Sequence, residues 1–355
     1  MKKQLTAKRW IAFFLILSVL FLTFLASVAY IIDPFFQFRV KDNSYFLTAP
    51  YVNAGLIKNH DYDTLIVGSC MIGSFDMNQF RNELGLNPLK AESGSMGPNS
   101  IAAYINYAAS VGKAKHYFVN IDLASYQAGS DDIINHYLMK TDFLSRFQYL
   151  LGYDTWFRFI PVDCGLMLYK SILGDFPSGK MTQRTSIDFN GTGRLEEKHS
   201  RAIVVRNREA HLYEVSPVVL ENLQERFTEQ IDSFISQIDF SAGSFTFIFP
   251  PYSTLYWCDA QDLGYFDAFM SAKDYFIQEL LARNCTVYDF QSADVANDLD
   301  NYKDSTHYSP AINAWMTECF ASEDYLVTAE NQSFLQEQLL ENTKIFRAQN
   351  PDLFN

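Results

Sequence analysis

Hydrophobic and polar positions divide the chain into one long apolar stretch and a series of shorter periodic segments. Residues 11–32 contain no charged side chain, and 22 residues rising about 1.5 Å each are enough to cross the hydrocarbon of a bilayer. A cleaved signal peptide is the alternative, because residues 27–29 (Ser-Val-Ala) resemble a small-residue cleavage site. The apolar region of signal peptides is usually about 7–15 residues long, so the pattern favours an uncleaved transmembrane helix.

Charged residues on the two sides of this stretch predict its orientation. Residues 1–32 hold four basic side chains, all before the apolar stretch, and no acidic one, whereas Asp33 follows directly. Basic residues favour the cytoplasmic side of a membrane, so we expect residues 1–10 in the cytoplasm and residues 33–355 outside. The sequence thus predicts a single-pass protein of the cell membrane with an extracellular main domain.

Beyond the juxtamembrane residues, short apolar runs alternate with segments of helical periodicity. Residues 63–67 form an apolar, β-branched run, and residues 116–122 form another. A helical stretch from Ser100 to about Val111 lies between them, and strand, helix, strand is the order of a parallel α/β sheet. The remaining predicted elements are a helix opened by Ser216-Pro217 with apolar positions from Leu220 to Ile238, strand 244–249, helix 265–283, strand 285–290, a helix opened by Ser309-Pro310 and a polar helix near 330–349.

This order predicts an open α/β domain over residues 61–325, with an insertion at about 125–215 where the periodicity is lost. The aromatic residues of the insertion are expected to form the core of a cap; exposed aromatic rings there would instead suit stacking on sugar rings. Juxtamembrane residues 33–60 and a C-terminal helix at 326–355 complete the expected organisation. Open α/β sheets bind ligands at the carboxyl ends of their strands, so five loops should converge on one crevice: 68–73, 93–99, 122–126, 250–253 and 301–307.

Composition and charge exclude several classes of function. The chain has 28 basic and 41 acidic residues, a net charge of -13, and no basic run after Arg9, which argues against nucleic-acid binding. Five cysteines and six histidines are dispersed without CxxC or HExxH spacing, so we expect no metal site, and disulfide pairing cannot be deduced. The first turn of the sheet lacks GxGxxG, which disfavours a Rossmann-like cofactor enzyme.

Two of the loops carry reactive side chains. Gly68-Ser69-Cys70 presents a nucleophile at a strand-to-helix turn, where helix amides favour a thiolate or an oxyanion. Asp304 stands three residues before His307, a spacing that lets the carboxylate orient the imidazole as a general base. A Cys70-His307-Asp304 triad is therefore the predicted catalytic set. The plainer alternatives are a buried core residue at Cys70 and a turn-capping carboxylate at Asp304.

In this order, the motifs resemble those of the SGNH (GDSL-type) hydrolase superfamily. Residues 68–71 (Gly-Ser-Cys-Met) and 301–309 (Asn-Tyr-Lys-Asp-Ser-Thr-His-Tyr-Ser) are similar to the G-[ST]-S-M and N-Y-x-D-x-x-H-Y-S motifs of its membrane-anchored, DltD-like branch. That branch includes D-alanylation and alginate acetylation proteins. The resemblance covers about residues 60–125 and 240–320. It implies a three-layer, flavodoxin-like parallel sheet, with Cys70 where the family has its nucleophilic serine.

The resemblance also implies groups that bind the oxyanion or the substrate. Gly94 falls on the glycine block of the family, with Gly97 as the alternative, and its amide would join that of Cys70 in an oxyanion hole. Ser69, one residue before Cys70, is the second candidate nucleophile. The oxyanion asparagine of the superfamily has no clear equivalent. Asp122 stands at the end of the second strand, where the membrane-anchored relatives also tend to carry an aspartate.

These residues lead to two functional hypotheses. The first is an extracellular acyl esterase or O-acyltransferase, in which an acetyl or D-alanyl group passes to Cys70 and then to water or to a hydroxyl of a cell-envelope polysaccharide or polymer. The resemblance implies a membrane-bound O-acyltransferase as partner and no cofactor. The second is a catalytically inactive SGNH-like module that binds or presents polysaccharide. The two differ in whether Cys70 comes within hydrogen-bond reach of His307.

Overall fold

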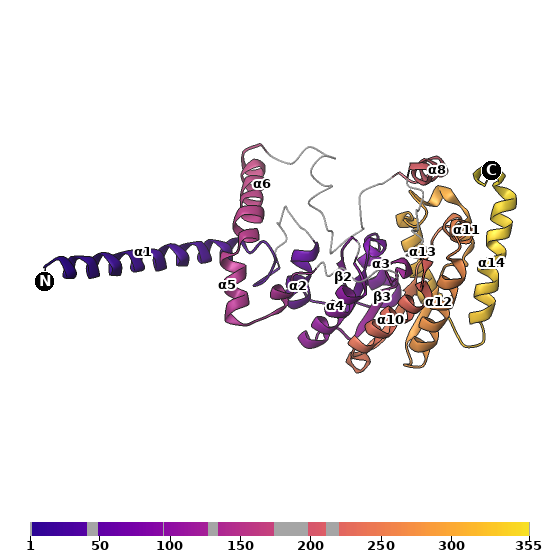
Figure 1. The fold of residues 1–355 in the computed structure, drawn as a ribbon, viewed down its shortest axis with the longest axis horizontal. Coiled ribbons are helices and arrows are strands. Elements are labelled where there is room, and N and C mark those ends of the chain that lie inside the picture. Colours follow the sequence, from indigo (N-terminus) through magenta and orange to yellow (C-terminus); the bar gives the residue numbers. More distant parts are fainter. Residues whose placement is uncertain are drawn as a thin grey trace. The chain divides into compact units, whose positions relative to one another are not determined.

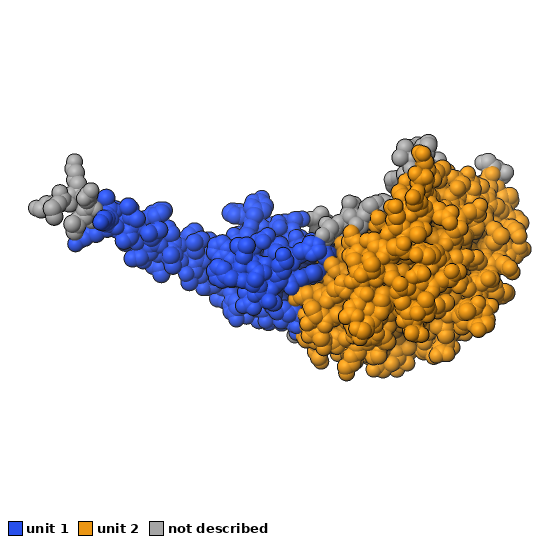
Figure 2. Space-filling view, turned by 60° about the horizontal axis from the view of Figure 1, so that its bottom comes forward, with its two compact units in different colours: residues 1–60, 134–186 blue, residues 61–133, 187–355 orange. Residues whose placement is uncertain are grey.

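The computed structural model describes residues 2–40, 49–94, 96–126, 134–173, 198–210 and 220–354. The chain forms two compact units, coloured blue and orange in Figure 2. Unit 1 comprises Met1–His60 and Ile134–Ser186, and unit 2 comprises Asp61–Ile133 and Ile187–Asn355.

The described part of unit 1 is helical. Its helices and helical turns are α1 (Lys2–Ile32), α2 (Ala49–Asn59), η4 (His136–Met139), α5 (Phe143–Leu151), η5 (Asp154–Phe159) and α6 (Ile160–Leu173). Within α1, the stretch Ala7–Ile32 is the candidate span; its most apolar 18-residue window has a mean hydropathy of 2.7 and is not buried against other described residues. The prediction of an N-terminal apolar helix is confirmed, and this helix is long enough to cross a membrane.

A five-stranded parallel sheet forms the centre of unit 2 (Figure 1). Its strands are β1 (Thr64–Gly68), β2 (Pro88–Glu92), β3 (His116–Asn120), β4 (Ser244–Phe249) and β5 (Thr286–Asp289), arranged in the order β2-β1-β3-β4-β5. This order occurs in doubly wound α/β folds, and the prediction of an α/β fold with a parallel sheet is confirmed. Strand β2 was not predicted, because Pro88, Lys90 and Glu92 interrupt its apolar character. An edge strand tolerates such residues.

Helices of unit 2 cover both faces of the sheet. On β4, the ring of Phe247 contacts Phe234 of α10 (Leu223–Gln237) and Phe276 of α12 (Phe266–Leu281). On β3, the ring of Phe118 contacts Phe320 of α13 (Pro310–Ser322). Phe247 is in register with Val119, and neighbouring residues on a strand point to opposite faces, so these two groups of helices lie on opposite sides. The described part of unit 2 therefore has three layers.

Unit 2 has helices at the predicted positions near 100–111, 265–283, 310–322 and 330–349, and others at 77–84, 201–210 and 254–262 that were not predicted. In chain order, the helices are α3 (Met77–Gln79), the turn η2 (Phe80–Leu84), α4 (Pro98–Val111), α8 (Arg201–Ala210), α10 (Leu223–Gln237), α11 (Thr254–Asp262), α12 (Phe266–Leu281), α13 (Pro310–Ser322) and α14 (Gln332–Gln349). The predicted start of the long helix at Ser216-Pro217 lies outside the described residues. Placing Leu220 on α10 is wrong, because Asn222 adopts a left-handed φ of 57° and α10 begins after it.

Helix α11 was not predicted, although its start carries a recognisable signal. Ser253 is its N-cap, and the Ser253 side chain accepts a hydrogen bond from the amide of Tyr256. Pro250 and Pro251 directly before it suggested only a loop.

The described parts of the expected insertion fall in both units. Residues 134–173 belong to unit 1, where Tyr149 and Phe159 are buried, and residues 198–210 belong to unit 2. The boundary expected near residue 215 lies outside the described residues.

Candidate active site

The loop after β1 is held tightly where the strand ends. A side chain at Gly68 would place its Cβ 2.7 Å from the Cβ of Asn120, so this position on β1 requires glycine. Ser69 is the N-cap of a short 3₁₀ turn, Cys70–Ile72. The buried Lys90 of β2 donates hydrogen bonds to the carbonyl oxygens of Gly73 (2.9 Å) and Phe75 (3.0 Å), which fixes the chain just beyond the turn.

The loop before α13 folds back on itself and presents its acidic and imidazole groups together. The amide of Lys303 donates to the carbonyl oxygen of His307 (3.1 Å), and Tyr302 and Tyr308 form an antiparallel bridge. Asp304 Oδ1 accepts hydrogen bonds from the amide of His307 (2.7 Å) and from that of Thr306 (2.9 Å). The carboxylate thus organises its own loop as well as the imidazole.

Side chains from separate elements hold the two loops against each other. Tyr308 Oη and Asn313 Nδ2 both donate to the carbonyl oxygen of Met71, at 3.2 and 3.1 Å. The amide and the hydroxyl of Ser253 donate to the carbonyl oxygen of Ser305, at 3.0 and 2.7 Å. The loops after β1 and β4 are therefore joined to the loop before α13, as the position of strand ends at one edge of a parallel sheet predicts.

A thiol, an imidazole and a carboxylate meet in this place. Cys70 Sγ lies 3.0 Å from His307 Nε2, and His307 Nδ1 lies 2.8 Å from Asp304 Oδ2. About a third of the His307 side chain (32%) is exposed, and Cys70 is partly exposed, so the pair is open to solvent. The three residues of the predicted catalytic set are brought together in the expected order. Such a chain can move a proton between sulfur and nitrogen while the carboxylate orients the ring.

Electrostatics favours the charged form of the imidazole. Burial by itself lowers the pKa of His307, but the hydrogen bonds with Asp304 and Cys70 and the negative charges of these groups raise it from 6.5 to about 10. Burial raises the pKa of Asp304, but the hydrogen bond from His307 and its positive charge, together with the two amides, lower it to about 2. An imidazolium held between the Asp304 carboxylate and Cys70 is the form that this geometry stabilises.

The raised pKa of His307 predicts how stability depends on pH. Because the folded pKa is about 10 and the unfolded value 6.5, the stabilisation is complete below pH 6.5 and is lost as the pH rises toward 10. The melting temperature of the wild type should exceed that of His307→Gln most at pH 6, and this difference should shrink between pH 7 and 10. Thermal unfolding of both proteins checks this, and a difference that stays constant over the range would contradict it.

The other predicted site residues lie at the same edge in different settings. Ser69 is buried, and its hydroxyl has no hydrogen-bond partner among the described residues. Gly94 is exposed. Gly68 and Glu92 are register partners at the ends of β1 and β2, and Cys70 and Gly94 each follow two residues later, so both lie just beyond the same edge of the sheet. The alternative, Gly97, is the buried N-cap of α4. No hydrogen bond joins Ser69, Gly94 or Gly97 to His307 or to the Cys70 thiol within the described part of the chain.

Asp122 follows β3 and is held by Tyr252, which donates its hydroxyl proton to Oδ1. Burial raises the pKa of Asp122, while the Tyr252 hydrogen bond and the positive charge of His307 act in the opposite direction. This carboxylate therefore lies within the electrostatic reach of the imidazole.

Sequence reasoning assigned no role to several residues that shape the site, although Tyr308 stands in the motif at 301–309. Tyr252, Tyr308 and Asn313 contact the site through side-chain bonds over long stretches of chain, and no local spacing announces such bonds. Asn120 is buried in register with Ile248, and neither atom of its side-chain amide has a partner among the described residues. Its place at the end of β3 was the available signal.

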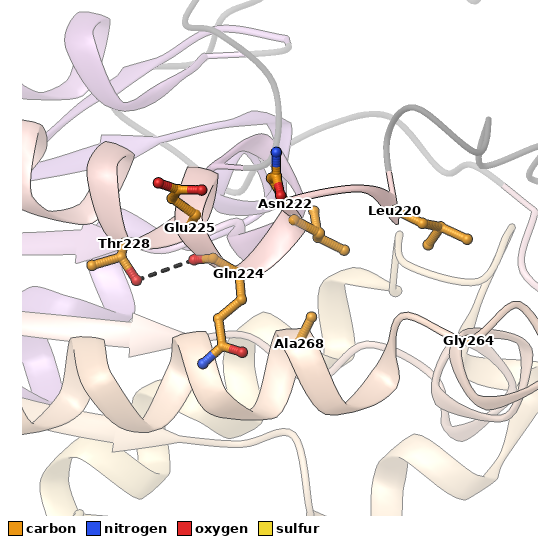
Figure 3. A pocket seen from close by; sticks show the side chains of 8 residues that line it. Leu220, Asn222, Gln224, Glu225, Thr228, Gly264 and Ala268 are labelled. Atoms are coloured by element: carbon orange, nitrogen blue, oxygen red, sulfur yellow. Dashed lines mark hydrogen bonds between the residues drawn. The ribbon is translucent and has the colours of Figure 1, made fainter.

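Neither a metal site nor a disulfide is found in the described residues. No group of three or more histidine, cysteine or acidic side chains there could hold a metal ion. All five cysteines are described and free. A separate open depression of about 590 Å³ lies beside the start of α10, lined by Asn222, Leu223 and Thr228 among others (Figure 3). None of its lining residues belongs to the predicted site.

Neither a protein-family model nor a curated protein matches this sequence. The case for function accordingly depends on the geometry of Cys70, His307 and Asp304.

Proposed function

We propose that this protein is an SGNH-like acyl esterase or O-acyltransferase that works through a thioester on Cys70. The observation that carries the proposal is the 3.0 Å contact between Cys70 Sγ and His307 Nε2, with Asp304 on the far nitrogen of the ring. A thiolate beside an imidazolium is a strong nucleophile toward acyl esters. The motifs at residues 68–71 and 301–309, which resemble those of the DltD-like branch, support the same reading.

The reaction consists of two acyl transfers. The Cys70 thiolate attacks the carbonyl carbon of the ester, and the carbon–oxygen bond to the leaving alcohol then breaks, while the His307 imidazolium gives its proton to that alcohol. In the second transfer, water or a polymer hydroxyl attacks the thioester, His307 accepts its proton, and Cys70 leaves as a thiolate. Asp304 keeps the ring oriented and stabilises its charge throughout. These steps require no cofactor.

The proposed place of action is the outer face of the cell membrane. Helix α1 would anchor the protein, with the basic residues before it on the cytoplasmic side. A cell-envelope polysaccharide or polymer would be the acceptor, and a membrane-bound O-acyltransferase the source of acyl groups. Anchoring both proteins in one membrane raises their effective concentration without a tight complex.

The competing hypothesis, an inactive module that binds polysaccharide, requires no contact between Cys70 and His307. The 3.0 Å distance between these side chains and the raised pKa of His307 favour the enzyme.

Acetylation of the full-length protein in detergent tests the proposal. After exposure to p-nitrophenyl acetate, intact-mass and peptide analysis should show one acetyl group, located on Cys70. Cys164 is exposed and provides an internal comparison, because a thiol without an imidazole partner should react much more slowly. Equal acetylation of Cys70 and Cys164, or none on Cys70, would contradict the proposed catalytic function. Polysaccharide binding would then be measured next.

A further inference from the structure

Exposed apolar side chains gather in one part of unit 1. Among the described residues outside α1, most of the large apolar side chains with more than half of their surface exposed lie on α5, η5 and α6 or, for Tyr153, directly before η5. They are Phe143 (82%), Leu144 (71%), Tyr153 (75%), Phe157 (74%), Leu168 (61%) and Ile172 (69%). A water-soluble surface rarely collects so many, so this surface is expected to meet an apolar environment.

The exposed side chains are ordered along the helices. On α5, the rings of Phe143 and Phe147 lie 6.2 Å apart on one face, whereas Ser145 and Tyr149 on the other face are buried. The stacked rings of Tyr153 and Phe157 follow at 5.3 Å. Residues four apart on a helix share a face, so each pair forms part of an apolar stripe.

On α6 the same spacing continues. Leu168 and Ile172 are four residues apart and exposed, and Cys164, four residues before Leu168, is exposed as well. These three positions share one face of the helix.

This surface is attached directly to the end of α1. The Tyr149 hydroxyl of α5 donates to Oδ1 of the buried Asp33 (2.7 Å), which also accepts the amides of Gln37 and Phe38. The ring of Phe35 lies 5.4 Å from that of Tyr149 and 4.7 Å from that of Phe159. Within unit 1, α5 and α6 lie at the C-terminal end of α1 and run across its direction (Figure 1). Helices α5 and α6 are therefore at the level where a membrane-spanning α1 would leave the bilayer.

The charges around this end suit a lipid headgroup region. The Arg39 guanidinium donates to the carbonyl oxygens of Tyr30 (2.6 Å) and Ile31 (2.9 Å) at the end of α1 and lies 5.0 Å over the Tyr30 ring. Described residues 33–40, 49–60 and 134–173 hold six basic and four acidic side chains, whereas the whole chain has a net charge of -13. Basic and aromatic side chains next to an apolar stripe are typical of helices that lie in a membrane interface.

We propose that α5, η5 and α6 form a second membrane contact, with their exposed apolar side chains in the lipid interface next to α1. The inference rests on the proposed anchoring by α1 and is independent of the acyl chemistry. Lipid covers the exposed stripe, and the interface fixes the orientation of unit 1 at the bilayer surface. Anchoring by α1 alone would leave the rest of unit 1 free to rotate about the axis of this helix.

Depth measurement by spin labelling tests this in the full chain, with Cys70→Ser removing the other accessible thiol. Cys258, Cys285 and Cys319 are buried, so the label attaches to Cys164. The protein is reconstituted into vesicles of phosphatidylethanolamine and phosphatidylglycerol, and collisions of the label with oxygen and with a water-soluble nickel chelate are compared. We expect oxygen collisions to dominate, at a depth of about 5–10 Å below the headgroups.

Two further labels separate this inference from the anchoring itself. Both use the Cys164→Ser, Cys70→Ser background, with Leu20→Cys in α1 and Glu229→Cys on the exposed surface of unit 2. Nickel collisions at Cys164 equal to those at residue 229, with residue 20 in lipid, would overturn the second contact and leave the anchor intact. Residue 20 in water would refute the anchoring. A Cys164 label that neither reagent reaches would mean that protein covers the stripe, which also overturns the proposal.

Discussion

Replacing His307 by alanine is expected to slow acetylation of Cys70 by about 10²–10⁴-fold at neutral pH, the range that a positioned acid–base group contributes. The imidazolium, 3.0 Å from the sulfur, stabilises the thiolate that attacks the ester. The rate is measured from the time course of intact mass with p-nitrophenyl acetate. Unchanged acetylation in this variant would mean that Cys70 reacts as an ordinary exposed thiol.

Asp304→Asn separates orientation from charge. Asparagine keeps an oxygen that can accept the hydrogen bond from His307, but it removes the charge that holds the pKa of His307 well above its usual range. We expect a loss of rate in the same direction as for His307→Ala, while Cys164, which has no such partner, keeps its slow reaction in both variants. Acetylation of the buried Cys258, Cys285 or Cys319 would indicate loss of folding and not loss of catalysis.

The sheet was largely predictable because four of its five strands are short runs of apolar, aromatic or β-branched residues. Strand 244–249 was placed at its observed bounds, and 63–67 and 285–290 within one residue at each end. The edge strand β2 failed because its Lys90 is buried for a reason outside the strand, namely its hydrogen bonds to the turn after Cys70. Sequence periodicity indicates which face of a strand is apolar, but it does not indicate that a lysine on the strand is buried because it hydrogen-bonds to a neighbouring loop.

The candidate site was likewise predictable only in part. Cys70, His307 and Asp304 could be predicted to meet because strand ends and a three-residue spacing constrain them. The contacts of Tyr308 and Asn313 with Met71 span more than 230 residues of chain and depend on how α13 packs, which no local pattern encodes. The aromatic residues of the insertion were expected in a core, yet Phe143 and Phe157 are exposed, because an apolar side chain has the same pattern whether protein or lipid covers it.

Lys273→Met is expected to have the largest effect on stability, lowering the free energy of unfolding by about 3–5 kcal/mol. Lys273 on α12 is fully buried, and its Nζ lies 2.8 Å from Oδ2 of Asp289, the last residue of β5, which is also buried. Without the ammonium, the carboxylate remains buried with only the amide of Gln291 (3.1 Å) as a charge-stabilising donor among the described residues. Urea unfolding of the detergent-solubilised chain, followed by tryptophan fluorescence, measures the change.

An exposed pair of the same type provides the matched control. Lys344 and Glu341 lie 3.0 Å apart with about 60% of each side chain exposed, and Lys344→Met should change the free energy of unfolding by less than about 1 kcal/mol, because water already solvates both charges. Replacing the whole ion pair by apolar residues, with Lys273→Met and Asp289→Leu together, should recover part of the lost free energy of unfolding. If Lys273→Met cost no more than Lys344→Met, the buried pair would not hold α12 to the end of β5. Because Lys273 does not contact Cys70 or His307, the folded fraction of this variant should still acetylate at the wild-type rate, which distinguishes a residue that supports the fold from one that takes part in the reaction.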